Sequence, residues 1–120
     1  MPAARLLGME LGARSDREAH VSLAARPELL QVDGVVHGGI LATLADTAAV
    51  HLLYPQLASE RSMTSIEFKL NFLRPATAGG GPIDARARVA HMGRKVCLAE
   101  VDVEQAGKIV AKGLFTYLVL

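Results

Sequence analysis

Apolar and polar residues alternate along much of the chain, which is the pattern of β-strands that bury one face. The alternation is weak over residues 5–14 and clear over residues 18–25, where Arg26-Pro27 ends it because proline has no N–H to donate to a neighbouring strand. In the second half of the chain, further strands are predicted over residues 62–73, 83–89, 97–104 and 109–120, with turns over residues 91–94 and 105–108 between the last three.

One long apolar segment separates the second predicted strand from the third. Residues 27–37 form a predicted loop with a turn at Asp33-Gly34, and a helix follows that begins at Gly38 or Gly39 and ends at Tyr54. A proline comes next, and the residue before a proline disfavours helical backbone angles. The segment is apolar nearly all round, so most of its surface should be buried.

The predicted elements follow one another in the order β-β-α-β-β-β-β. Consecutive strands joined by short turns imply a largely antiparallel sheet, and the single long helix must cover one face of it, which makes an α+β domain. A chain of 120 residues is one domain of ordinary size, so residues 1–120 are predicted to form a single domain. Because the helix is apolar on all sides, a sheet curled around it or a partner subunit must cover the rest of its surface.

Composition excludes several classes of function. The net charge is +1, Lys and Arg are scattered and there is no Trp, so no nucleic-acid partner is expected. The single cysteine permits no internal disulfide and fits a reducing cytoplasm. The N-terminus shows no basic segment followed by a long apolar stretch, and the helix is too short to span a bilayer, so a cytoplasmic location without membrane contact is predicted. No group of His, Cys, Asp and Glu has metal-ligand spacing, so no metal is expected.

Two unusual features lie close together in the predicted helix. Gly38 and Gly39 have no Cβ, so a ligand can approach their backbone N–H groups closely. The first N–H groups of a helix have no intrahelical partner and lie at the positive end of its dipole, where they can hold an oxyanion. Asp46 is an acid in an apolar helix, beyond the first turn that the dipole favours, and it costs free energy unless it is paired. We interpret Asp46 as catalytic; the glycine pair has the alternative role of permitting close helix–sheet packing.

Helix geometry keeps these two features apart within one chain. Gly38 and Asp46 are eight residues apart, which is about 12 Å along a helix axis and too far for both to reach one carbonyl. Two antiparallel helices from two subunits could bring them together twice. The motif therefore predicts an obligate dimer as well as an enzyme.

The spacing Gln31-x-x-Gly34-x-x-His37-Gly38-Gly39, the acid at Asp46 and the strand ending Phe72-Leu73-Arg74-Pro75-Ala76 resemble a hotdog-fold acyl-CoA thioesterase of the phenylacetic-acid-degradation (PaaI-like) type. The resemblance covers about residues 18–120. It implies an antiparallel sheet wrapped around one long central helix, and hydrolysis of an aryl- or medium-chain acyl-CoA to free acid and CoA. It also implies a homodimer with active sites across the interface, and usually a homotetramer built from two such dimers.

The resemblance implies a role for each residue that matches the motif. The N–H of Gly38, with Gly39 beside it, would hold the thioester oxygen, and Asp46, reaching in from the other subunit, would be the nucleophile or the general base for water. Gln31 matches a loop residue that orients the thioester or the water, and His37 would order the loop. No cofactor is implied, because CoA is part of the substrate.

Two further positions are implied in the same way. Ser65 matches a position where a hydroxyl assists in some members, although strict alternation would place it on the face opposite Ile66 and Phe68. Gly93-Arg94-Lys95 matches a turn near which CoA phosphates often lie. Some relatives carry a Thr one helical turn after the acid where this chain has Val50, which leaves Ser65 as the hydroxyl that could assist.

Two other functions stay open at the level of sequence. Asp46 and His51 have the interval of the Asp and His of hotdog hydratases and dehydratases, but five residues turn a helix by about 140°, so the two side chains do not share a face. His51 is instead expected to make a local hydrogen bond or to meet another subunit. A non-catalytic acyl-CoA-binding module would keep the fold without needing an ionised acid near the glycine pair.

Overall fold

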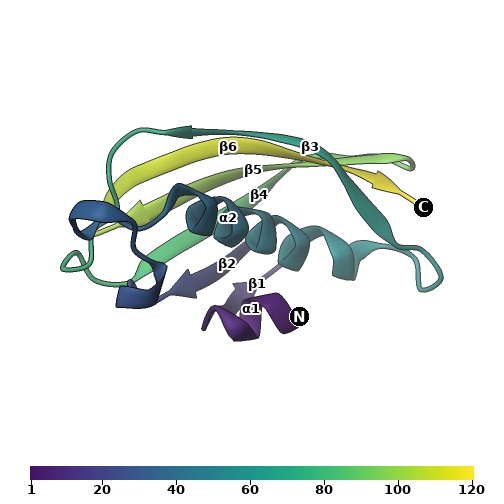
Figure 1. Ribbon diagram of the computed structural model, residues 1–120. Helices are drawn as coiled ribbons and strands as arrows, with labels where there is room; N and C mark the ends of the chain where they lie inside the picture. The colour runs from purple at the N-terminus through teal and green to yellow at the C-terminus, as the bar shows by residue number, and fades with distance from the viewer.

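A long helix lies across one face of a six-stranded antiparallel sheet (Figure 1). The computed structural model describes residues 1–120. Its elements are α1 (Pro2–Leu6), β1 (Glu10–Arg14), β2 (Glu18–Leu23), α2 (Gly38–Leu53), β3 (Met63–Phe72), β4 (Ile83–Met92), β5 (Val96–Gln105) and β6 (Lys108–Val119). The strand order across the sheet is β1-β2-β4-β5-β6-β3, so β1 and β3 are the edge strands. The predicted α+β class and the hotdog architecture are confirmed.

The N-terminal segment differs from the prediction. Residues Pro2–Leu6 form a helix, and only Glu10–Arg14 form a strand, so the weak alternation over residues 5–14 does not mark a single strand. Pro2 lies in the first helical turn, where its fixed φ suits a helix. Ala4 and Met9 are buried in the core and anchor the segment on either side of the break.

The second hairpin is longer than the sequence indicates. Strand β4 runs to Met92, past the predicted start of the turn at residue 91, and the connection to β5 is only Gly93–Lys95. The pairing of β4 with β5 shifts between Val89 and His91. An irregular register of this kind adds a residue to one strand and breaks the strict alternation on which the prediction rests.

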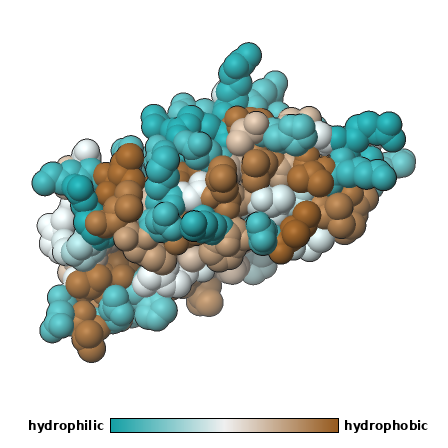
Figure 2. Space-filling view, turned by 90° about the horizontal axis from the view of Figure 1, so that it is seen from above, coloured by the Kyte–Doolittle hydropathy of each residue, from teal (hydrophilic) through white to brown (hydrophobic).

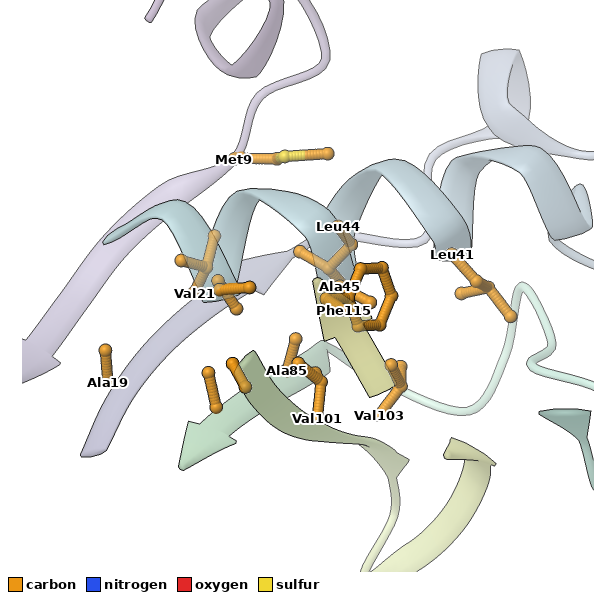
Figure 3. Packing of buried hydrophobic residues seen from close by; sticks show 14 of the residues in the cluster. Met9, Ala19, Val21, Leu41, Leu44, Ala45, Ala85, Val101, Val103 and Phe115 are labelled. Carbon is orange, nitrogen blue, oxygen red and sulfur yellow. The ribbon is translucent and has the colours of Figure 1, made fainter. Parts of the chain in front are cut away.

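The core lies between α2 and the inner face of the sheet (Figure 3). From the helix, Leu44 and Ala45 are fully buried, and they face strand residues such as Ala85, Val101 and Phe115. Many of the inner-face strand residues are small, which lets the helix approach the sheet closely; these are Ala19, Ala85, Ala87, Ala99 and Ala111. Burying one Leu or Val side chain contributes about 1.5–3 kcal/mol, so this contact fixes the position of α2 on the sheet.

The helix is not centred on the sheet. It packs mainly over β2, β4 and β5, and contacts β6 far less. The inner face of the sheet at the β3 edge is therefore left open. The sheet curls around only part of the helix, which leaves Asp46 and Val50 partly exposed.

Strand β3 contains a β-bulge that changes which side chains face the helix. Ser65 pairs with Tyr117, and Phe68 pairs with Phe115, but Glu67 pairs with Thr116, so one extra residue is accommodated at Ile66. Directly opposed residues share a face, and Phe68 stacks on the buried Phe115 with ring centroids 4.9 Å apart. Ser65 therefore lies on the same, helix-facing side as Phe68. The prediction of opposite faces is wrong, because strict alternation does not pass through a bulge.

The edge of the sheet formed by β3 carries several exposed apolar side chains. Ile66, Phe68 and Phe72 on β3 are 53%, 48% and 54% exposed, and Leu114 on the neighbouring β6 is 45% exposed. Viewed from above, where β3 and β6 lie in Figure 1, brown apolar side chains are interspersed among teal hydrophilic ones (Figure 2). A long edge strand with exposed aromatic residues presents unpaired backbone groups and apolar surface together.

The outer face of the sheet is polar and tightly ion-paired. The Asp102 carboxylate, only 4% exposed, lies 2.7 Å from Lys112 Nζ and 3.1 Å from an Arg88 guanidinium nitrogen. Burial opposes ionisation of Asp102, but hydrogen bonds from Lys112 and Arg88 outweigh it and hold the pKa of this carboxyl below its usual range. None of the helices is both long and apolar enough to cross a membrane.

Candidate functional site

A cavity of about 510 Å³ opens where α2 begins. Its walls are the loop residue Gln31, the segment Val35–Gly38, Leu41, and the segment Phe72–Ala76 that follows β3. The structure thus brings together Gln31, His37 and Gly38, three of the residues singled out in the sequence. It also brings in the Phe72-Leu73-Arg74-Pro75-Ala76 strand ending, which the resemblance matched without assigning it a role.

Backbone hydrogen bonds hold the loop that carries Gln31 and His37. The predicted turn is confirmed, because Asp33 and Gly34 both have left-handed backbone angles, with φ of 62° and 70°. Gln31 N–H donates to the Val35 carbonyl at 2.8 Å, and His37 N–H donates to the Leu29 carbonyl at 2.9 Å. The loop is folded on itself before it enters the helix.

A buried glutamine, Gln105, binds the backbone directly after Phe72–Ala76, the segment that forms the opposite wall of the cavity. Its side chain, in a residue only 6% exposed, accepts a hydrogen bond from Thr77 N–H at 2.9 Å and donates to the carbonyls of Thr77 and Gly81, both at 2.8 Å. The next backbone link along this wall runs from Val36 N–H to the Ala76 carbonyl at 2.8 Å. Sequence reasoning placed Gln105 in a turn and missed this contact, which no local pattern reveals.

The first turn of α2 leaves one backbone donor free. His37 is the N-cap residue, and its Nδ1 accepts the N–H of Gly39 at 2.9 Å, which requires the imidazole proton of the neutral ring to be on Nε2. The N–H groups of Ile40 and Leu41 donate to the His37 carbonyl at 2.9 and 3.3 Å. Only Gly38 N–H donates to no group in the chain, and Gly38 lines the cavity.

The side of Gly38 is closely covered by an aromatic ring. A Cβ placed on Gly38 would lie 3.3 Å from Cζ of Phe72, which is a tight contact. A Cβ on Gly39 would lie 3.0 Å from His37 Nδ1 and would crowd the cap. The glycine pair thus serves two needs, because Gly39 makes room for the cap while Gly38 has its N–H free for a ligand and its face against Phe72.

Asp46 lies further along α2 and does not line this cavity. Its Oδ1 accepts a hydrogen bond from the hydroxyl of Tyr117, a residue of β6 that is 2% exposed. Burial raises the pKa of the Tyr117 phenol far above its usual value, and the hydrogen bond to Asp46 and the charge of that carboxylate raise it further. Sequence analysis did not single out Tyr117. A polar hydroxyl in a strand that is apolar on both faces needs a buried partner, and that signal could have identified it.

The bulge in β3 brings Ser65 to the same region. Ser65 is paired with Tyr117 across β3 and β6 and shares its helix-facing side. Within one chain there are therefore two groups of candidate residues. The first group lies at the start of α2 and consists of Gly38, His37 and Gln31. The second lies further along α2 and on the strands beside it, and consists of Asp46, Tyr117 and Ser65.

The other candidates lie away from both groups. His51 Nε2–H donates to the Gly12 carbonyl at 2.9 Å, while Arg14 Nε donates to the His51 carbonyl at 3.1 Å, so this histidine ties α2 to β1. The hydrogen bond is made within the chain but to a residue 39 positions away, so it is not the local bond that was expected, and His51 does not form a dyad with Asp46, which is bonded to β6. Gly93–Lys95 connect β4 to β5 at the end of the sheet opposite the start of α2 (Figure 1).

The chain is similar to named proteins in both sequence and structure. A model of the Thioesterase superfamily matches residues 33–112. The acyl-coenzyme A thioesterase PaaI of Escherichia coli is 33% identical over 110 residues, which cover 90% of this chain and 75% of the relative. A mutant of the phenylacetic acid degradation protein PaaI from Thermus thermophilus superposes with a TM-score of 0.89 at 27% identity, covering 98% of each chain. A conserved protein of Pseudomonas aeruginosa superposes with a TM-score of 0.92 at 32% identity, covering 100% of this chain and 94% of the other. This chain therefore belongs to the thioesterase superfamily and is a PaaI-like hotdog thioesterase.

Proposed function

We propose that this enzyme hydrolyses an acyl-CoA thioester, with an aryl or medium-chain acyl group, to the free acid and CoA. The proposal rests above all on Gly38 N–H, which has no partner in the chain and lies at a cavity of about 510 Å³. A preorganised donor at a helix start stabilises a carbonyl oxygen as it becomes negative. The name of the Escherichia coli relative, an acyl-coenzyme A thioesterase, supports the substrate class.

In the proposed reaction, water attacks the carbonyl carbon of the thioester while Asp46 accepts a proton from that water. The electrons of the carbonyl double bond move to its oxygen, which Gly38 N–H holds. The intermediate then collapses, the C–S bond breaks and CoA leaves as the thiolate. In the other route the Asp46 carboxylate attacks the carbon itself, the C–S bond breaks and CoA leaves as the thiolate. Water then hydrolyses the resulting anhydride to the free acid and restores the Asp46 carboxylate. Both routes use the same two residues and give the same products.

The proposed active site requires two copies of the chain. Along one helix, Gly38 and Asp46 are separated by about 12 Å, and Asp46 does not line the cavity beside Gly38. The apolar edge strand β3, with Phe68 and Phe72 about half exposed, is the surface on which a second copy would join the sheet. We propose a homodimer in which Asp46 of each subunit serves Gly38 of the other, and a homotetramer made of two such dimers.

The cavity supports the proposed acyl group. Its volume of about 510 Å³ lies within the range of small-molecule sites, and Val35, Val36, Leu41 and Phe72 give it an apolar lining. The exposed cations in the Gly93-Arg94-Lys95 turn form no ion pair within the chain. This turn lies far from the cavity of its own chain, so we propose that it meets the phosphates of a CoA bound between the two copies. Hydrolysis as proposed needs no cofactor or metal, and we propose a cytoplasmic location.

The test is CoA release by Asp46→Asn, measured with a thiol reagent on phenylacetyl-, benzoyl- and medium-chain acyl-CoAs. Asn keeps the size of the side chain but cannot accept a proton or attack as a carboxylate, so the rate should fall about 10²–10⁴-fold. Asp16→Asn is the matched control, because Asp16 is exposed in the β1–β2 turn and its side chain makes no hydrogen bond or ion pair. Its rate should equal that of the wild type.

Three results would contradict the proposal. Hydrolysis by Asp46→Asn at the wild-type rate would show that Asp46 has no catalytic role. Hydration of enoyl-CoA by the wild type without CoA release would identify a hydratase. Binding of acyl-CoA with no turnover on any member of the panel would identify a binding module.

A further inference from the structure

The buried phenol of Tyr117 is the least expected polar group in the core. On the inner face of β6, its neighbours two residues away are Phe115 and Val119, and both are apolar and buried. A Phe at position 117 would fill nearly the same volume without bringing a hydroxyl into the core. The buried hydroxyl therefore calls for an explanation beyond packing.

The Tyr117 hydroxyl is hydrogen-bonded to Asp46 and to no other residue. It donates to Asp46 Oδ1, and the Asp46 backbone carbonyl oxygen lies 3.4 Å from it. Asp46 accepts no other hydrogen bond at its carboxylate and forms no ion pair. A single bond to one oxygen limits rotation of the carboxylate and leaves Oδ2 without a partner in the chain.

We propose that Tyr117 is a positioning residue for the hydrolysis, holding Oδ1 of Asp46 so that Oδ2 is the oxygen presented to water or to the thioester carbon. Tyr117 acts through Asp46 and does not itself touch the substrate. The inference rests on the proposed function, since it gives Tyr117 a role only through the catalytic carboxylate.

The same bond depends on the phenol keeping its proton, because only a protonated hydroxyl can donate. Because burial and the neighbouring carboxylate raise the pKa of Tyr117 far above its usual value, the phenol stays protonated and remains a donor across the working pH range.

No other charged or titratable group of the chain competes for this carboxylate. His51, on the same helix, is turned toward β1, where its ring donates a hydrogen bond to the Gly12 carbonyl.

The neighbouring strands also supply no competing group. On β5, Cys97 is paired opposite Tyr117, but its thiol contacts Met92 and Gly93. Burial raises the pKa of that thiol. From β3, Ser65 is uncharged, and Glu67 pairs with Thr116 on the other face.

The experiment is Tyr117→Phe, with kcat and KM measured from pH 4 to 9. We expect kcat to fall about tenfold while KM changes little, because the lost bond is to the reacting carboxylate and not to the substrate. Tyr54→Phe is the matched control, because the chain has only these two tyrosines and Tyr54 is 49% exposed with no hydrogen bond at its hydroxyl. The kcat and KM of Tyr54→Phe should match those of the wild type.

A second measurement keeps the inference testable if Tyr117→Phe does not fold. The chain has no Trp, so its near-ultraviolet spectrum reports mainly on its tyrosines. The Asp46→Asn variant should shift the tyrosine band relative to the wild type, since an amide is a weaker acceptor than a carboxylate. An unchanged band would show that the Tyr117–Asp46 bond is absent, and would overturn the inference.

The outcomes separate the inference from the proposed function. If Asp46→Asn retains full activity, the proposed role of Asp46 fails and the inference fails with it. If Asp46→Asn is inactive but Tyr117→Phe keeps the wild-type kcat and KM, only the inference fails. Adding Tyr117→Phe to Asp46→Asn should cause no further loss of the residual rate, and a further tenfold loss there would show that Tyr117 acts by another route.

Discussion

Replacing Gln105 with Leu should loosen the wall of the substrate cavity more than it destabilises the core. The Gln105 side chain makes three hydrogen bonds of 2.8–2.9 Å to the backbone of Thr77 and Gly81. A Cβ on Gly80 would lie 2.6 Å from Gln105 Cδ, so the segment is folded tightly around this side chain. Leu has a similar size but can make none of these bonds.

The loss of these three hydrogen bonds sets the expected loss of stability. Each net hydrogen bond contributes about 0.5–1.5 kcal/mol to stability. Thr77 and Gly81 are exposed residues, so water can replace part of what Gln105 supplied, and we expect a loss of about 2 kcal/mol in the free energy of unfolding. For a domain of this size that lowers Tm by roughly 8 °C. The segment Phe72–Ala76 should then move more freely, and KM should rise about three- to tenfold.

Gln56→Leu separates the two effects. Gln56 also donates two backbone hydrogen bonds, to the carbonyls of Asp16 at 2.9 Å and Leu52 at 2.8 Å, but it follows the far end of α2 and does not line the cavity. Urea unfolding should show a comparable loss of stability in both variants, while steady-state kinetics should show a raised KM only in Gln105→Leu. Equal KM values in Gln105→Leu and the wild type would refute the role of Gln105 in holding the cavity wall.

Two further predictions concern Tyr117 and the β3 edge. Because the folded state raises the pKa of Tyr117, its contribution to stability is complete below about pH 10, the usual value, and falls by about 1.4 kcal/mol per pH unit above it. Urea unfolding between pH 9 and 11 should show a steeper decline in the wild type than in Tyr117→Phe, and identical slopes would contradict the assignment. A Cβ on Gly113 would lie 2.2 Å from the Lys69 carbonyl oxygen, so Gly113→Ala should push β3 away from β6. This substitution should lower the free energy of unfolding by about 1–3 kcal/mol or more, and sedimentation should show weaker self-association. Gly79→Ala, with open space around its Cβ, should leave both stability and self-association unchanged.

Part of the candidate site follows from short stretches of sequence. The loop turn at Asp33-Gly34, the cap by His37 and the free N–H of Gly38 all arise within eight residues of one another. Such features depend on backbone geometry at a helix start, where the order of donors and acceptors is set by neighbours in the chain. They could be predicted, and the structure adds that Gly39 N–H is taken by the cap.

The rest of the site depends on pairings between distant residues. Ser65 faces the helix because β3 carries a bulge at Ile66, and the shift is visible only in the register against β6. Tyr117 and Asp46 are brought together although they are 71 residues apart. Gln105 is 28 residues from Thr77, the residue it holds. No periodic pattern in the sequence indicates these pairings.

The sequence by itself determined the element order, the antiparallel α+β class, the long buried helix and the donor at its start, because periodicity, turn chemistry and capping act over a few residues. Only the tertiary structure decided the N-terminal helix, the face that Ser65 occupies, the partner of the Asp46 carboxylate and the hydrogen bonds of Gln105 to Thr77 and Gly81. A side chain's direction in a strand depends on every bulge before it, and a buried polar group takes whichever partner the packed sheet brings near. Both are properties of the assembled sheet and helix, and neither is set by neighbours in the chain.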